Sequence, residues 1–192
     1  MFRLLIMIGL VFGTLSARAD WTLDPVASSL TFASVKNGSI VEPHRFGSLS
    51  GNIDASGEAV VTVALDSVDT LIPIRDERMR DLLFEVKQFP TATFRAKVEV
   101  SFHQTGAVGT SSEFPLEGEL TIHGVTIKTS VPVKINRVST DRVQVLPVRP
   151  LILSVAQFGM GEGLEALRKI AGLESIGPAV PVSFLLVFQR SS

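Results

Sequence analysis

The sequence predicts an all-β protein of about eight antiparallel strands with two short helical insertions. Three observations support this fold class: long segments in which apolar and polar residues alternate, glycines and prolines between those segments, and no regular alternation of strands with helices. Because a side chain changes sides at each step of an extended strand, alternation gives one face for a core and one for water. Antiparallel strands in this number favour a barrel or a sandwich.

Three strands are predicted in the first third of the chain. The first covers residues 29–35 and is followed by a turn at Asn37-Gly38. The second covers residues 46–53, and its two glycines mark a bend or bulge that helps a sheet to curl. The inner face of the third is formed by Ala59, Val61, Val63 and Leu65.

A helix is predicted over residues 75–84, where the apolar residues change to a helical spacing. Its other side is charged and has two interpretations. One is a solvated face with ion pairs along the helix. The other is that Arg75 and Arg78 lie beside an apolar cavity and hold a polar or anionic ligand head, which guanidinium geometry suits.

The middle of the chain shows the clearest alternation. Every second residue of 92–102 is apolar, including Phe94 and Phe102. Residues 114–123 repeat this pattern, Gly124 offers a turn, and residues 125–135 form the next strand.

A further strand region covers residues 143–155 and is interrupted by Pro147 and Pro150. Proline cannot donate to a strand ladder, so this region is expected at a sheet edge or at a change of direction. A second short helix follows, with Gly172 as its C-cap and one apolar face made of Leu164, Leu167 and Ile170.

The last strand, residues 180–189, is apolar on both faces. A strand of this kind must be covered on both sides. We therefore expect one of the two helices to pack on its outer side.

Residues 1–19 have the three parts of a secretory signal: Arg3 at the start, an apolar middle, and Ala17-Arg18-Ala19 before Asp20. The apolar run is shorter than the roughly 20 residues that span a bilayer, which disfavours a membrane anchor. We expect cleavage after Ala19, leaving one domain over residues 20–192 that does not span a membrane, with the bacterial periplasm as its destination.

Composition excludes several classes of site. The chain has no cysteine, so a disulfide framework, a thiolate metal site and a cysteine nucleophile are all excluded. The net charge is −1 and the basic residues are scattered, which argues against a nucleic-acid partner. Twelve Phe with no Tyr and a single Trp indicate a non-polar interior. No cofactor is predicted.

The three histidines, His44, His103 and His123, lie in no recognisable catalytic or metal-binding motif. His123 shares a strand face with Glu117 and Glu119, but ligands two residues apart on one strand stand about 6.8 Å apart, too far to hold one ion without help. We interpret His123 as a strand-end residue that makes hydrogen bonds at a tight turn, and we predict neither a metal site nor a catalytic residue.

The residues also resemble a known family. Five segments occur in the order seen in YceI-like proteins: residues 46–53, 65–70, 75–80, 89–94 and 118–126. This resemblance covers residues 21–138 and, by pattern, the final strand. It implies an exported, lipocalin-like eight-stranded antiparallel barrel with an apolar tunnel that binds a polyisoprenoid chain or a similar amphiphile. The chain departs from the family pattern at Arg78, where a histidine is usual, and over residues 151–176, which are longer and more helical.

Three function classes follow. The first is a carrier or reservoir for an isoprenoid, quinone-like or fatty amphiphile, with a barrel interior lined by Phe32, Phe94, Phe102, Leu120, Ile122, Val131 and Phe184. The second is a hydrolase or isomerase acting on such a ligand, which needs Glu117, Glu119 or His123 to converge in the cavity. The third is a protein-binding module with a solid core. The strand pattern alone does not separate a packed interior from a lined one, and the resemblance favours binding without catalysis.

Overall fold

Eight antiparallel strands close into a barrel in the computed structural model, which describes residues 19–99 and 107–191. β1 pairs with both β4 and β12, and these two pairings close the ring. This confirms the predicted eight-stranded barrel. In ring order the strands are β1 (Ala19–Leu23), β4 (Leu49–Asp54), β5 (Glu58–Ala64), β7 (Thr91–Lys97), β8 (Ser111–Ile122), β9 (Val125–Arg137), β10 (Arg142–Pro147) and β12 (Ala179–Arg190).

The barrel wall extends beyond the closed ring because β12 is long enough to have different neighbours at its two ends. Its second half pairs with β10 and β1, whereas its first half pairs with β11 (Leu151–Ser154) and β2 (Ser29–Lys36). β2 continues into a hairpin with β3 (Ile40–Phe46), and the end of β3 pairs with β6 (Val68–Asp69).

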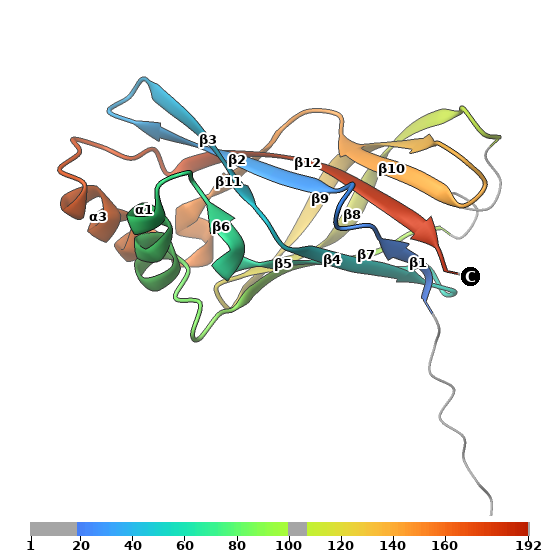
Figure 1. Ribbon diagram of the computed structural model, residues 1–192, viewed down its shortest axis with the longest axis horizontal. Helices are drawn as coiled ribbons and strands as arrows, with labels where there is room; N and C mark the ends of the chain where they lie inside the picture. The colour runs from blue at the N-terminus through green and yellow to red at the C-terminus, as the bar shows by residue number, and fades with distance from the viewer. Residues whose placement is uncertain (1–18, 100–106, 192) are drawn as a thin grey trace, which may run out of the picture.

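The helical segments gather at the end of the barrel where β2 and β3 project, as Figure 1 shows. A short turn, η1 (Leu65–Ser67), precedes β6, and α1 (Pro73–Arg78) runs directly into a wider π-type turn, η2 (Met79–Leu83). After β11 the chain forms η3 (Val155–Phe158) and α3 (Gly161–Ile170). Both predicted helices are confirmed, and Gly172 takes the left-handed φ of +63° expected of a C-cap.

The expectation that a helix covers the outer side of the last strand is wrong. α3 packs against η2 and η3, and α1 packs against η2 and β6. Val187 on the outer side of β12 is nevertheless almost fully buried. The segment after β1 lies along it: the Asp24 N–H donates to the Val187 carbonyl over 2.8 Å, and the Val187 N–H donates to Ser28 Oγ over 2.9 Å.

The predicted strand over residues 46–53 is confirmed from Leu49 onward as β4, but its start is wrong, because the chain breaks at Gly47 and Phe46 belongs to β3. The Gly47 and Ser48 N–H groups donate to the carbonyl and the hydroxyl of Ser67, not to a neighbouring strand. β3 contains Pro43, and because proline is unusual inside a strand, residues 40–45 were not predicted to form one. Within the described chain, residues 40–44 pair with β2 alone and form an edge of the sheet. The missing N–H of Pro43 therefore costs no hydrogen bond to a second neighbouring strand.

The strand region with two prolines matches the expectation of an edge and a change of direction. β10 has β9 and β12 as neighbours, but the chain turns away after Pro147, and β11 pairs only with β12 among the described residues. β7 ends at Lys97, and the rest of the predicted 92–102 strand, including Phe102, lies partly outside the described residues.

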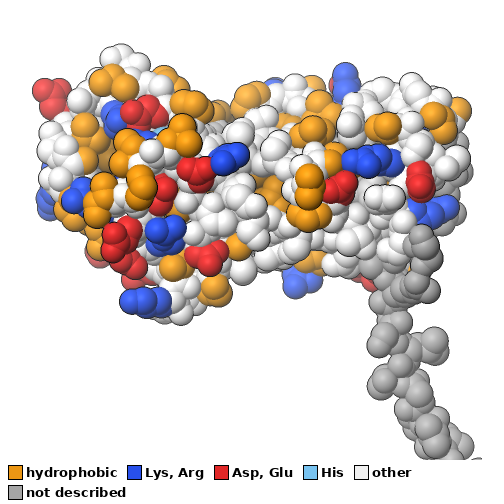
Figure 2. Space-filling model, in the orientation of Figure 1, with side chains coloured by type: hydrophobic (Ala, Val, Ile, Leu, Met, Phe, Trp, Pro, Cys, Tyr) orange, Lys and Arg blue, Asp and Glu red, His pale blue; other side chains and the backbone are white. Residues whose placement is uncertain are grey.

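Charged side chains of both signs are spread over the face shown in Figure 2, with hydrophobic side chains between them. No helix in residues 19–99 and 107–191 combines the length and apolarity needed to cross a bilayer.

Candidate ligand-binding cavity

A cavity of about 250 Å³ lies inside the barrel. Apolar side chains from the barrel strands form most of its wall. Thr93, Thr129 and Ser154 are the polar residues of the described wall, and none of the described lining residues is charged. The volume is close to the lower end of the range for small-molecule sites, about 300 Å³. The interior is therefore hollow and suited to a narrow apolar guest.

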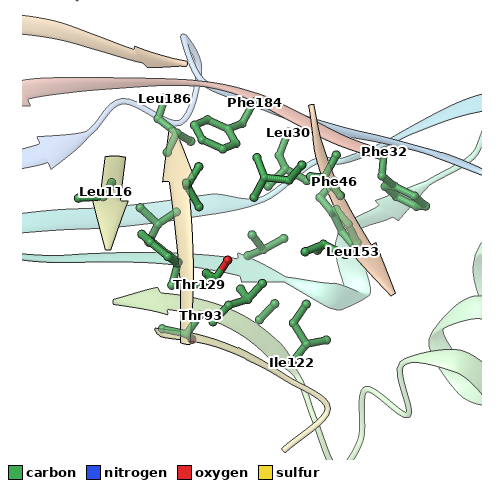
Figure 3. Close-up of a pocket in the computed structure, with 18 of the residues that line it drawn as sticks. Leu30, Phe32, Phe46, Thr93, Leu116, Ile122, Thr129, Leu153, Phe184 and Leu186 are labelled. Atoms are coloured by element: carbon green, nitrogen blue, oxygen red, sulfur yellow. The ribbon is translucent and has the colours of Figure 1, made fainter. Parts of the chain in front are cut away.

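The strand alternation sends the predicted residues into this cavity. Phe32, Phe94, Leu120, Ile122, Val131 and Phe184 all belong to its wall. Figure 3 shows Phe184, Leu30, Phe46 and Phe32 following one another along one side of it. Phe102 lies outside the described residues. Contact of these side chains with a ligand stays a prediction.

Gly118 creates room for one of these aromatic rings. It stands among the inward residues of β8, and a Cβ at this position would lie 2.5 Å from the Phe94 ring and 2.5 Å from the Arg95 carbonyl oxygen. The Phe94 ring therefore lies across the bare backbone of the neighbouring strand. A glycine inside a strand often marks such a close approach.

The helical end contributes lining residues that the sequence analysis did not predict. Leu83 at the end of η2 and Phe84 just after it reach the cavity, as do Val155 and Phe158 from η3 and Met160 just after η3. The apolar face of the predicted helix at residues 75–84 is the sequence feature that could have indicated Leu83 and Phe84 as lining residues. Only the packing of η2 over the barrel end shows that this face closes the cavity.

Arg75 and Arg78 do not belong to the cavity wall. Arg75 donates from Nε to Thr70 Oγ1 over 2.8 Å and from one terminal nitrogen to the Thr70 carbonyl over 2.7 Å. Its other terminal nitrogen forms an ion pair with Glu42 at 2.5 Å. Lys36 lies 2.7 Å from the same carboxylate, and hydrogen bonding from Lys36 is the main cause that lowers the pKa of Glu42. Binding of a ligand head by the two arginines stays a prediction.

The groups required by the enzyme alternative do not converge in the cavity. Glu117 and Glu119 are exposed on the outer face of β8, and Glu117 accepts a hydrogen bond from Ser130. His123 lies at the β8–β9 turn with a φ of +51°, its Nε2 is 2.7 Å from Glu85, and its ring is 4.2 Å from that of Phe89. This confirms the predicted hydrogen-bonding role of His123 at a tight turn. The described part of the chain contains no group of three or more His, Asp or Glu placed to hold a metal ion.

Comparison with known proteins places the chain in a group of related barrels. The family model of the YceI-like domain matches residues 21–188. A solved polyisoprenoid binding domain from Saccharophagus degradans, implicated in plant cell wall breakdown, is 35% identical with a TM-score of 0.89. That match covers 91% of this chain and 100% of the other. No curated protein matches this chain.

Two more distant structures share the fold. Burkholderia cenocepacia BcnA is 20% identical with a TM-score of 0.64, and the match covers 86% of this chain and 98% of BcnA. The Campylobacter jejuni YceI protein is 18% identical with a TM-score of 0.57, over 78% of this chain and 85% of that one. With a family match over almost the whole described barrel, this chain belongs to the YceI-like family.

Proposed function

We propose that this protein is an exported lipid-binding protein that holds an isoprenoid or a similar long amphiphile in its barrel cavity, as a carrier or reservoir. The observation behind the proposal is the cavity itself, whose described wall is apolar except for three hydroxyl side chains. Burial contributes roughly 0.8 kcal/mol for each CH₂ group removed from water. A chain of ten or more such groups therefore offers a large gross binding energy before ordering costs are subtracted.

The comparisons support the same ligand class. The related Saccharophagus degradans structure is described as a polyisoprenoid binding domain, and it is aligned over its whole length with this chain. Binding in such a cavity requires no catalytic group. Quinone-like and fatty amphiphiles also match the chemistry of the wall, so the proposal includes them.

Export to the periplasm is the second part of the proposal. Residues 1–19 have the composition of a secretory signal, and the expected cleavage after Ala19 falls at the start of β1. Removal of the segment takes away two of the 18 basic residues and none of the 19 acidic ones. Processing at this point would leave Trp21 and Leu23, which belong to the core, in the mature chain.

Native mass spectrometry of the full chain purified from cells tests the proposal. We expect wild-type protein to carry one lipid with a long hydrocarbon chain. Thr129→Trp should reduce the bound fraction at least fivefold, because Thr129 lines the cavity and an indole would occupy the space of the guest. Lys128→Trp is the matched control, since its exposed side chain precedes Thr129 on the same strand.

Wild-type protein that is free of lipid, or equal loading of the Thr129→Trp and Lys128→Trp variants, would contradict binding in the cavity. Conversion of the bound lipid during incubation would favour the enzyme alternative. The cleaved N-terminus is read from the same spectra, and an intact mass that includes residues 1–19 would contradict export.

A further inference from the structure

The inner face of the β2–β3 hairpin changes from apolar to polar beyond the cavity. Leu30 pairs with Phe46, and the next pair on the same face is Phe32 with His44. Ser34 and Glu42 form the pair after that. Leu30, Phe32 and Phe46 all line the cavity, whereas His44 and the following pair do not. An amphiphile whose tail lies in the cavity would therefore meet polar groups along this face, with His44 first.

His44 is buried and only partly satisfied. Its relative exposure is 5%, and its ring lies 5.1 Å from that of Phe32, which stacks on Phe46 at 5.2 Å. Nε2 is 2.8 Å from Ser34 Oγ, but Nδ1 has no hydrogen-bond partner among the described residues. Buried polar atoms in native proteins are nearly always paired, so a single unpaired ring nitrogen indicates a missing partner.

The charges near His44 are already paired with one another. Glu42 lies between Lys36 and Arg75, and the remaining Arg75 donors are directed at Thr70. Asp76 accepts hydrogen bonds from the backbone and hydroxyl of the same Thr70. Burial, and then the nearby Arg75 charge, lower the pKa of His44, so its imidazole is neutral near pH 7. A phosphate bound there would compete with Glu42 for Lys36 and Arg75, and it would lie close to the carboxylates of Glu42 and Asp76.

We propose that His44, oriented by Ser34, binds the polar head of the amphiphile, and that this head is an uncharged hydroxyl or carbonyl oxygen and not a phosphate. The proposal rests on the proposed function and adds the chemistry of the head group. If Ser34 donates to Nε2, then Nδ1 carries the proton and donates to the ligand oxygen. If Nε2 donates to Ser34, then Nδ1 accepts from a ligand hydroxyl. A hydroxyl head satisfies His44 in either tautomer.

Competition between two probes with the same tail tests this directly. Lipid-free full chain is incubated with equimolar geranylgeraniol and geranylgeranyl monophosphate, and the bound ratio is measured by native mass spectrometry. We expect the alcohol to bind at least tenfold more than the phosphate. His44→Phe should weaken alcohol binding about fivefold, the effect of losing one hydrogen bond. If His44→Phe does not fold, as judged by circular dichroism, Ser34→Ala is used, and a loss of about threefold is expected.

Glu42→Gln provides the opposite test. Loss of this carboxylate frees Arg75 and Lys36, so phosphate binding should rise at least tenfold while alcohol binding stays within twofold. Glu58→Gln is the matched control, because Glu58 pairs with Lys97 on a different strand pair and should change neither ligand.

Preferential binding of the phosphate by wild-type protein would overturn the head-group proposal and leave the proposed function standing. Unchanged alcohol binding in His44→Phe, or in Ser34→Ala where that variant is used, would also overturn it. Failure of wild-type protein to bind either probe would contradict the proposed function as well.

Discussion

Leu71 is 84% exposed and holds a left-handed backbone conformation. Its φ is +63°, a region where a Cβ is strained and glycine is not. The Leu71 N–H donates to Asp69 Oδ1 over 2.9 Å, so the turn depends on the backbone and not on the leucyl group.

Leu71→Gly should therefore raise the free energy of unfolding by about 0.5–1 kcal/mol. This is the backbone strain that glycine relieves in the folded protein, minus the stability lost because glycine gives the unfolded chain more conformational entropy. Urea unfolding at pH 7 measures the change. Val26→Gly is the control, because Val26 is 95% exposed but its φ is not positive, and it should lose stability. A loss in both variants would show that the Leu71 conformation costs little.

His44 should make stability depend on pH. Burial, followed by the Arg75 charge, lowers its pKa in the folded protein below 6.5. Below pH 6.5 the unfolded chain takes up a proton at this histidine that the folded protein does not. The free energy of unfolding therefore decreases as the pH is lowered, until the lowered pKa of the folded state is reached. Glu42 does not contribute in this pH range, because its pKa is lowered from the usual 4.5.

His44→Phe removes this proton uptake. Its free energy of unfolding, measured in urea at pH 7.5, 6.5 and 5.5, should fall less over this range than that of wild type. Parallel pH profiles for the two proteins would show that His44 titrates equally in the folded and unfolded states.

At the scale of elements, the contact between α3 and η2 depends on one missing side chain. A Cβ on Gly163 would lie 2.2 Å from the Leu82 carbonyl oxygen and 2.9 Å from Leu83 Cα, both of which are backbone atoms. Leu83 lines the cavity, so this contact also fixes part of the cavity end.

Gly163→Ala should lower the free energy of unfolding by about 1 kcal/mol. The overlap costs ~1–3 kcal/mol and outweighs the ~1 kcal/mol that alanine gains over glycine in a helix. Gly161→Ala in the same helix has no atom within 4 Å of the added Cβ and should be neutral or stabilising. Equal effects of the two substitutions, measured by urea unfolding, would show that α3 can move away from η2 at little cost.

The elements were predictable where their signal was local. β8, β9 and α3, which Gly172 follows in a left-handed conformation, are predictable from period and capping, because each needs only neighbouring residues to form. The break at Gly47 was not predictable, since it depends on Ser67, about 20 positions away. Pro43 concealed β3 for a related reason: proline is acceptable there only because the strand lies at an edge.

For the whole molecule, a guest in the cavity should act as part of the core. A ligand that binds only the folded state at 100 times its Kd adds about 2.7 kcal/mol. Lipid-free protein saturated with geranylgeraniol should therefore show a Tm about 5–10 °C higher than the free protein by calorimetry. Thr129→Trp, with the cavity filled, should show a much smaller rise than Lys128→Trp. An equal rise in both would locate binding outside the barrel.

The sequence by itself determined the fold class and the inward residues, because the period of two is a property of consecutive residues. Six of the seven predicted apolar side chains line the cavity, and the seventh, Phe102, lies outside the described chain. Only the tertiary structure decided that the interior is hollow, since this depends on how far opposite strands stand apart and on packing such as that of Phe94 over Gly118. It also decided that Arg75 pairs with Glu42 and that one His44 ring nitrogen has no hydrogen-bond partner among the residues that the structure describes, because these groups meet across long stretches of sequence.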